Sequence, residues 1–161
     1  MSKKPAEGTP ALREMLLSAK PSEFKITPTP ELPRVWAAMM EMRVGKADVS
    51  LVAVADGTTS MYFSTGGGFI GGGQHESVRG ANRQMLVLIE RLYPAFVVRE
   101  SPLEVVAGAV SFAVLTHEGL RVARDTEERL IQKKSPLWPV RYAGEQVITA
   151  LRLATEKGSH G

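Results

Sequence analysis

Alternating hydrophobicity in the first half of the chain predicts a β-hairpin. In residues 48–55 (DVSLVAVA) both sets of alternate positions are largely apolar, which is typical of an inner strand buried on both faces. Asp56-Gly57 is a strong turn signal, and residues 59–64 (TSMYFS) follow as the antiparallel partner. Residues 34–44, bracketed by a proline and a glycine, fit either a helix or a strand. We favour a strand, because two short strands follow at hairpin spacing.

The second half of the chain begins with a helical pattern and continues with another hairpin. Residues 76–92 carry one apolar stripe of Val78, Ala81, Met85, Leu88 and Leu92, and Pro94 ends the helix. Residues 110–116 and 120–123 flank His117-Glu118-Gly119, which we interpret as a three-residue hairpin loop. Asp125 with Glu128 resembles a capping box. A final helix follows, with an apolar stripe of Val140, Ala143, Val147, Ala150, Leu151 and Ala154.

This order of strands, helix, hairpin and helix predicts an α+β fold, in which helices pack on an antiparallel sheet of about five strands. We assign the folded domain to residues 33–157. Residues 1–32 are predicted to be a flexible segment with a short helix after Pro10 and a proline-rich tether. Residues 158–161 are predicted to be a disordered tail.

Composition indicates the cellular compartment and the classes of partner, but it does not indicate a reaction. The chain has 161 residues, 43% of them apolar, and no cysteine, so we expect one domain without disulfides in a reducing, cytoplasmic compartment. No apolar run is long enough to span a bilayer, and the first residues lack a signal core, so we expect no membrane partner. The formal charge of +3 is spread along the chain, which argues against a nucleic-acid partner.

A glycine-rich stretch, residues 64–75, joins the first hairpin to the helix and holds six of the fifteen glycines. It fits the spacing G-x-G-x-x-G, but the preceding strand belongs to an antiparallel hairpin, so a dinucleotide site is disfavoured. Another anion or small ligand remains an alternative at the helix start. The candidate ligand-binding residues are Gly66, Gly67, Gly68, Gly71, Gly72 and Gly73.

We favour a structural role for these glycines. They would form a narrow strand or bulge against which a neighbouring backbone packs closely, while Phe69 and Ile70 insert into the core. A variant of this interpretation makes the stretch an edge strand that pairs with another protomer. Phe69, Ile70 and the loop residue Trp138 are therefore the candidate interface residues.

His75 and Glu76 are the candidate catalytic residues. If Gly73 is the N-cap of the helix, Glu76 lies at its third position and His75 in its first turn. The helix dipole would disfavour the charged imidazole there, which suits a general base. However, one histidine beside a serine does not make a triad. No histidine spacing fits a metal site, and we expect neither metal nor cofactor.

Two resemblances extend these predictions. The element order looks like that of the profilin, roadblock and longin scaffolds, many of whose members are interaction modules that form dimers. Residues 48–154 resemble a set of bacterial hypothetical proteins without an assigned activity, which implies a bacterial source. That likeness is carried by Asp56-Gly57-Thr58, Tyr62-Phe63-Ser64, Gly66 to His75, Val110 to Gly119 and Val147 to Arg152.

We predict a small cytoplasmic protein–protein interaction or regulatory module. It is expected to form a homodimer, and another protein is a candidate further partner. The alternative is a small-molecule or anion-binding protein, or an enzyme, that uses residues 66–73 and His75. The interaction module should present an exposed apolar patch. The enzyme should bring His75 near a polar group from a distant segment.

Overall fold

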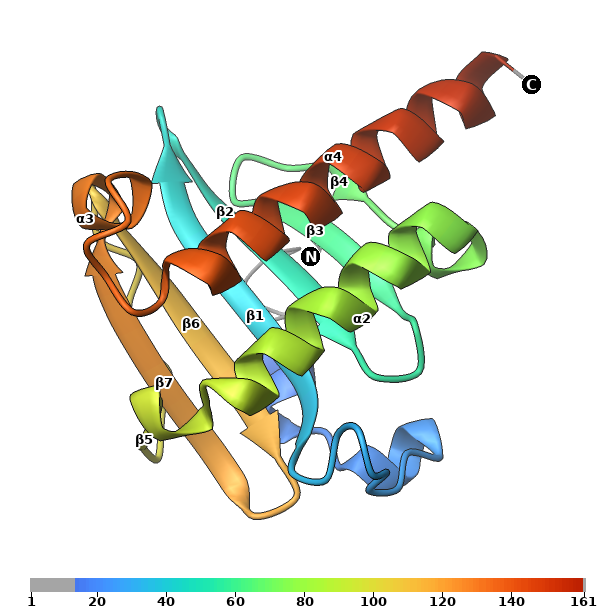
Figure 1. The fold of residues 1–161 in the computed structure, drawn as a ribbon. Helices are drawn as coiled ribbons and strands as arrows, with labels where there is room; N and C mark the ends of the chain where they lie inside the picture. Colours follow the sequence, from blue (N-terminus) through green and yellow to red (C-terminus); the bar gives the residue numbers. More distant parts are fainter. Residues whose placement is uncertain (1–13, 161) are drawn as a thin grey trace, which may run out of the picture.

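The computed structural model describes residues 14–160, with side-chain detail as far as Thr155. Its centre is an antiparallel seven-stranded sheet in the order β4-β3-β2-β1-β6-β7-β5 (Figure 1). The α+β class is confirmed. The sheet has more strands than the five expected because β4 and β5 span two residues each, too few for a hydrophobic period. The strands are β1 Val35–Val44, β2 Ala47–Val54, β3 Thr59–Phe63, β4 Gly68–Phe69, β5 Val97–Val98, β6 Ala109–Thr116 and β7 Gly119–Thr126.

The ambiguous residues 34–44 form the central strand, as favoured. β1 pairs with β2 on one side and with β6 on the other, so that Met40 lies opposite both Leu51 and Phe112. The first eight residues of β1 are all buried. A strand in this position has apolar side chains on both faces, which is why its sequence lacks a clear alternation.

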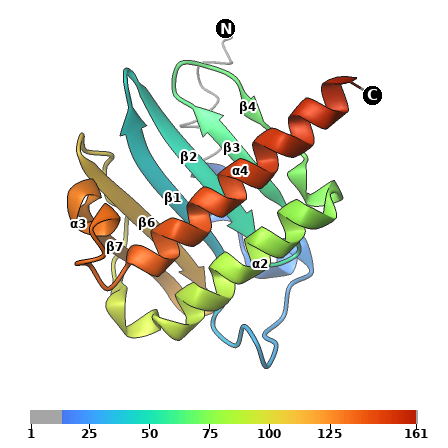
Figure 2. The same ribbon diagram turned by 45° about the horizontal axis from the view of Figure 1, so that its top comes forward.

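Two long helices, α2 (Glu76–Arg91) and α4 (Trp138–His160), cover one face of the sheet (Figures 1 and 2). The remaining helical elements are short: α3 Glu127–Ile131, and the 3-10 turns η1 Pro21–Phe24, η2 Gly72–Gln74 and η3 Tyr93–Ala95. The main core lies between the two long helices and the sheet. Its buried α4 residues all belong to the predicted stripe, of which only Ala150 is partly exposed. In α2 the fully buried residues include Leu86 and Ile89, whereas Ala81 and Leu88 are only partly buried.

The opposite face, called the second face below, is partly covered by the N-terminal segment. Residues 14–18 are helical, and Leu16 packs with Trp36 and Met39 in a second apolar cluster. The rings of Phe24 and Trp36 lie 5.7 Å apart. Leu32, further along the same segment, is 3% exposed in the main core. The described part of residues 1–32 therefore contributes side chains to both apolar clusters.

Local details differ from the expectations at several turns and helix ends. The second hairpin has a two-residue turn, because Thr116 already pairs with Gly119. The N-cap of α2 is His75 and not Gly73, since residues 72–74 form the separate turn η2. Thr126 caps α3, whereas Asp125 forms an ion pair with Arg129.

The C-terminal helix α4 continues to His160, past the point at which the sequence suggested a tail. Arg141 and Glu145, four residues apart on this helix, form an ion pair at 3.5 Å. Within residues 14–160, no helix is long and apolar enough to cross a membrane.

Candidate functional site

Three of the glycines in residues 64–75 are packed against the chain's own atoms. A Cβ on Gly68 would lie 2.1 Å from the carbonyl oxygen of Met61 in β3. One on Gly73 would lie 2.6 Å from the carbonyl oxygen of Gly57, and one on Gly72 would meet Leu151 of α4 at 2.3 Å. At these positions the loop packs closely against the edge of β3 and the first hairpin turn. Close packing of the backbone explains these three glycines without a ligand.

The other three glycines, Gly66, Gly67 and Gly71, have open space around them and adopt positive φ angles of 110°, 83° and 80°. Their conformation favours glycine because a Cβ is strained there. Phe69 packs edge-on against Phe63, with ring centroids 6.3 Å apart. Ile70 is 75% exposed, so the expectation that it inserts into the core is wrong. The chain turns at Gly71, which leaves Ile70 on the outside of the loop.

His75 and Glu76 line a groove between α2 and α4, called the helix groove below. It has a volume of about 710 Å³, and Gln84 of α2 with Gln146 and Thr149 of α4 also line it. In the described part of the chain, no hydrogen bond or ion pair joins the side chains of His75 and Glu76 to any other group. Amides and a hydroxyl can hold a ligand by hydrogen bonds, but they do not activate a nucleophile.

Among residues 14–160, no group of three histidine, aspartate or glutamate side chains is close enough together to hold a metal ion.

The third interface candidate, Trp138, is the first residue of α4. It is half-buried against the main core, and the Nζ atom of Lys133 lies 4.6 Å from its ring. Its ring therefore packs mainly within the chain.

A more apolar hollow lies on the second face, between residues 15–24 and strands β2 and β3. This sheet-face groove has a volume of about 350 Å³. Leu16 and Phe24 line it from the N-terminal segment, and Val52 and Val54 line it from β2. Met15 stands at the groove with its side chain 63% exposed. Sequence reasoning missed this groove because it forms only when the N-terminal segment folds onto two strands that follow it in the chain.

A row of polar side chains borders the apolar part of the second face. Tyr62, Ser50, Glu41, Ser111 and Arg124 lie directly opposite one another across β3, β2, β1, β6 and β7. The Ser50 hydroxyl donates to Glu41 at 2.6 Å, and the Arg124 Nε donates to Ser111 at 3.0 Å. Glu41 is only 3% exposed. This polar row, which includes the groove-lining Tyr62, separates the apolar surface from the far end of the strands.

Comparison with known proteins does not identify a functional site. The chain matches no protein-family model, and neither the curated proteins nor the solved structures give a significant match. The assignment of a function therefore rests on the residues described above.

Proposed function

We propose that this protein is a protein–protein interaction module that forms a symmetric homodimer through its second face. The observation that carries the proposal is the pairing of an exposed Met15 with an apolar groove on the same surface. A two-fold axis places the same patch on both sides of an interface. Each protomer can then insert its Met15 into the groove of the other.

The chemistry of the surface suits this arrangement. Methionine is flexible and polarisable, so it fills irregular apolar hollows well. The groove has an apolar lining from Leu16, Phe24, Val52 and Val54, and the polar row lies beside it. An apolar centre with polar surroundings is the usual composition of a protein interface.

The setting proposed for this module is the bacterial cytoplasm. The absence of cysteine fits a reducing compartment, and the bacterial source rests on the resemblance of residues 48–154. The glycine contacts also favour an interaction module over a ligand-binding loop, because Gly68, Gly72 and Gly73 already meet atoms of the chain itself.

The proposal is tested by light scattering on the purified chain and on two variants at about 100 μM, where a dimer with a micromolar Kd is mostly associated. Met15→Asp places a charge at the centre of the proposed contact. Leu153→Asp is the matched control, because Leu153 is 54% exposed but lines the helix groove. We expect a dimer mass for the unmodified chain and for Leu153→Asp, and a folded monomer for Met15→Asp.

A monomer mass for the unmodified chain would contradict the proposal. A dimer that persists in Met15→Asp but dissociates in Leu153→Asp would move the interface to the helix groove. Thermal melts of both variants at low concentration show whether the monomer fold is intact, so that a loss of association is not confused with unfolding.

A further inference from the structure

Met15 differs in exposure from the other methionines that the structure describes. It is 63% exposed, whereas the other five among residues 14–160 are each at most 6% exposed and belong to the two apolar clusters. These five are Met39, Met40, Met42, Met61 and Met85. In a free protomer, a dissolved oxidant therefore reaches the sulfur of Met15 directly. It reaches the other five sulfur atoms only when the fold opens locally.

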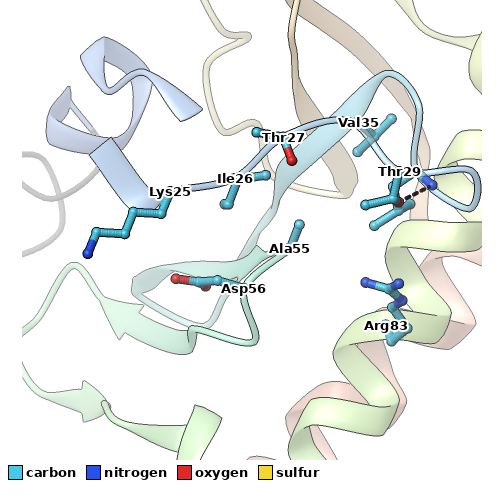
Figure 3. Close-up of a pocket in the computed structure, with 9 residues that line it drawn as sticks. Lys25, Ile26, Thr27, Thr29, Val35, Ala55, Asp56 and Arg83 are labelled. Atoms are coloured by element: carbon cyan, nitrogen blue, oxygen red, sulfur yellow. Dashed lines mark hydrogen bonds between the residues drawn. The ribbon is translucent and has the colours of Figure 1, made fainter. Parts of the chain in front are cut away.

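The segment that carries Met15 is packed on the sheet. The neighbouring Leu16 is buried, and the ring of Phe24 lies 5.7 Å from that of Trp36. Residues 25–29 then run along a small hollow beside the turn that follows β2 (Figure 3). Met15 is therefore exposed on an ordered surface of the domain and not on a loose end of the chain.

Hydrogen peroxide converts an exposed methionine to its sulfoxide. A lone pair of the thioether sulfur attacks one oxygen of the peroxide, and the O–O bond breaks. That oxygen stays on the sulfur, while both protons go to the other oxygen, which leaves as water. The sulfur is oxidised by two electrons and the peroxide is reduced by two electrons. A flexible apolar side chain thus becomes a polar one.

The sulfoxide suits the sheet-face groove less well than the thioether does. Leu16, Phe24, Val52 and Val54 give the groove an apolar lining. A sulfoxide oxygen accepts hydrogen bonds from water, and insertion between apolar side chains would remove that water without replacing its hydrogen bonds. Burial of a polar group without a partner has a large unfavourable free energy, so oxidation of Met15 should oppose its insertion.

We propose that Met15 is a site of reversible oxidation by peroxide and that its sulfoxide dissociates the homodimer. This inference rests on the homodimer proposed above. Peroxide reacts with the free protomer, because Met15 is covered in the dimer, and the oxidised protomers no longer associate. A thiol-dependent methionine sulfoxide reductase then supplies two electrons and two protons, which release the oxygen as water and restore the thioether.

The test treats the purified chain with hydrogen peroxide and measures two quantities. Peptide mass mapping over time gives the oxidation rate of each methionine, and light scattering over a dilution series gives the dimer Kd before and after treatment. We expect Met15 to be oxidised at least about tenfold faster than the five buried methionines. Its oxidation should raise the dimer Kd at least about tenfold. Treatment with methionine sulfoxide reductases for both sulfoxide epimers should restore the original Kd.

Two variants assign the effect to Met15. Met15→Leu removes the oxidisable sulfur but keeps every other methionine, including Met1, which lies outside the described residues. Whatever its dimer Kd, that value should be the same before and after peroxide. Met15→Gln places a polar amide where the sulfoxide would be, so it should raise the Kd without any oxidant. Thermal melts of both variants report whether the fold is intact.

A monomer mass before any treatment would overturn the homodimer and, with it, the role of oxidation. If the untreated chain is a dimer, three results would overturn the oxidation proposal alone. They are oxidation of Met15 no faster than that of the buried methionines, an equal rise in Kd in Met15→Leu, and an unchanged Kd when Met15 is fully oxidised. The last result would indicate that hydroxyl groups of the groove, from Thr58, Ser60 or Tyr62, donate to the sulfoxide.

Discussion

Glu90 is a buried carboxylate that ties the end of α2 to the start of β1. Its side chain accepts hydrogen bonds from the amides of Arg34 and Val35, at 3.1 and 2.9 Å, and forms an ion pair with the Arg34 guanidinium. Burial alone would raise the pKa of Glu90. The hydrogen bonds from Val35 and Arg34, together with the Arg34 charge, outweigh burial and lower the pKa below its ordinary value.

Replacement of Glu90 by glutamine should destabilise the protein by about 1 to 2 kcal/mol at neutral pH, because a neutral amide accepts weaker hydrogen bonds from the Arg34 and Val35 amides and the half-exposed Arg34 guanidinium loses its charged partner. The folded-state pKa of Glu90 is lowered. Its contribution to stability is therefore complete above the unfolded-state pKa and is lost as the pH falls through the folded-state pKa.

Urea unfolding at pH values from about 7 down to about 3 measures both effects. The loss of stability in acid should be smaller in Glu90→Gln than in the unmodified chain. Glu76→Gln is the control, because Glu76 is exposed on the same helix. An acid dependence that is the same in all three proteins would contradict the role given to Glu90.

Gly68 illustrates a glycine required by close approach. Gly68→Ala should destabilise the fold by about 2 kcal/mol or more, because the new Cβ would lie 2.1 Å from the backbone oxygen of Met61. Gly66→Ala adds the same methyl group in open space at φ of 110° and should cost only about 1 kcal/mol of conformational strain. Chemical denaturation of both variants checks the order, and an equal cost would show that Gly68 is not closely packed in solution.

At the level of whole elements, hydrophobic pattern predicted those strands and helices that are long enough to show a period. The hairpins around Asp56-Gly57 and His117-Glu118 and the helices α2 and α4 were all expected. The two-residue strands β4 and β5 were missed because backbone pairing alone defines them. The caps at His75 and Thr126 were each misplaced by one or two residues, since several neighbouring polar residues fit the same cap pattern.

The candidate site was less predictable than the fold. His75 was identified from the sequence, but its neighbours Gln146 and Thr149 come from a helix about 70 residues away and share the helix groove only through packing. The sheet-face groove depends on the path of residues 15–24 over the sheet. A proline-rich composition indicates an extended path but does not indicate which surface it follows.

The N-terminal segment should therefore contribute measurably to stability. Leu16→Ala and Phe24→Ala should each cost about 2 to 4 kcal/mol, because Leu16 is 8% exposed and Phe24 packs on Trp36. Ser22→Ala is the control, since Ser22 is exposed in the same segment. Urea unfolding provides the measurement. Costs below about 0.5 kcal/mol for both core variants would show that the segment is only a tether.

The molecule as a whole is a sheet with differently covered faces. α2 and α4 cover one face with long helices, whereas residues 14–26 cover part of the other (Figures 1 and 2). The sheet-face groove proposed as the dimer interface lies beside this segment, and Phe24 lines it. The segment therefore shapes the surface through which this protein is proposed to self-associate.

The most direct test of the central claim is an isotope-filtered NMR experiment on a mixed dimer, made from one labelled and one unlabelled copy of the chain. It detects only contacts between different protomers. We predict intermolecular nuclear Overhauser effects from the Met15 methyl group to the methyl groups of Val52 and Val54, because all three residues line the sheet-face groove. A dimer that lacks these contacts, or a chain that remains monomeric at the concentration used, would contradict the proposal that the second face mediates self-association.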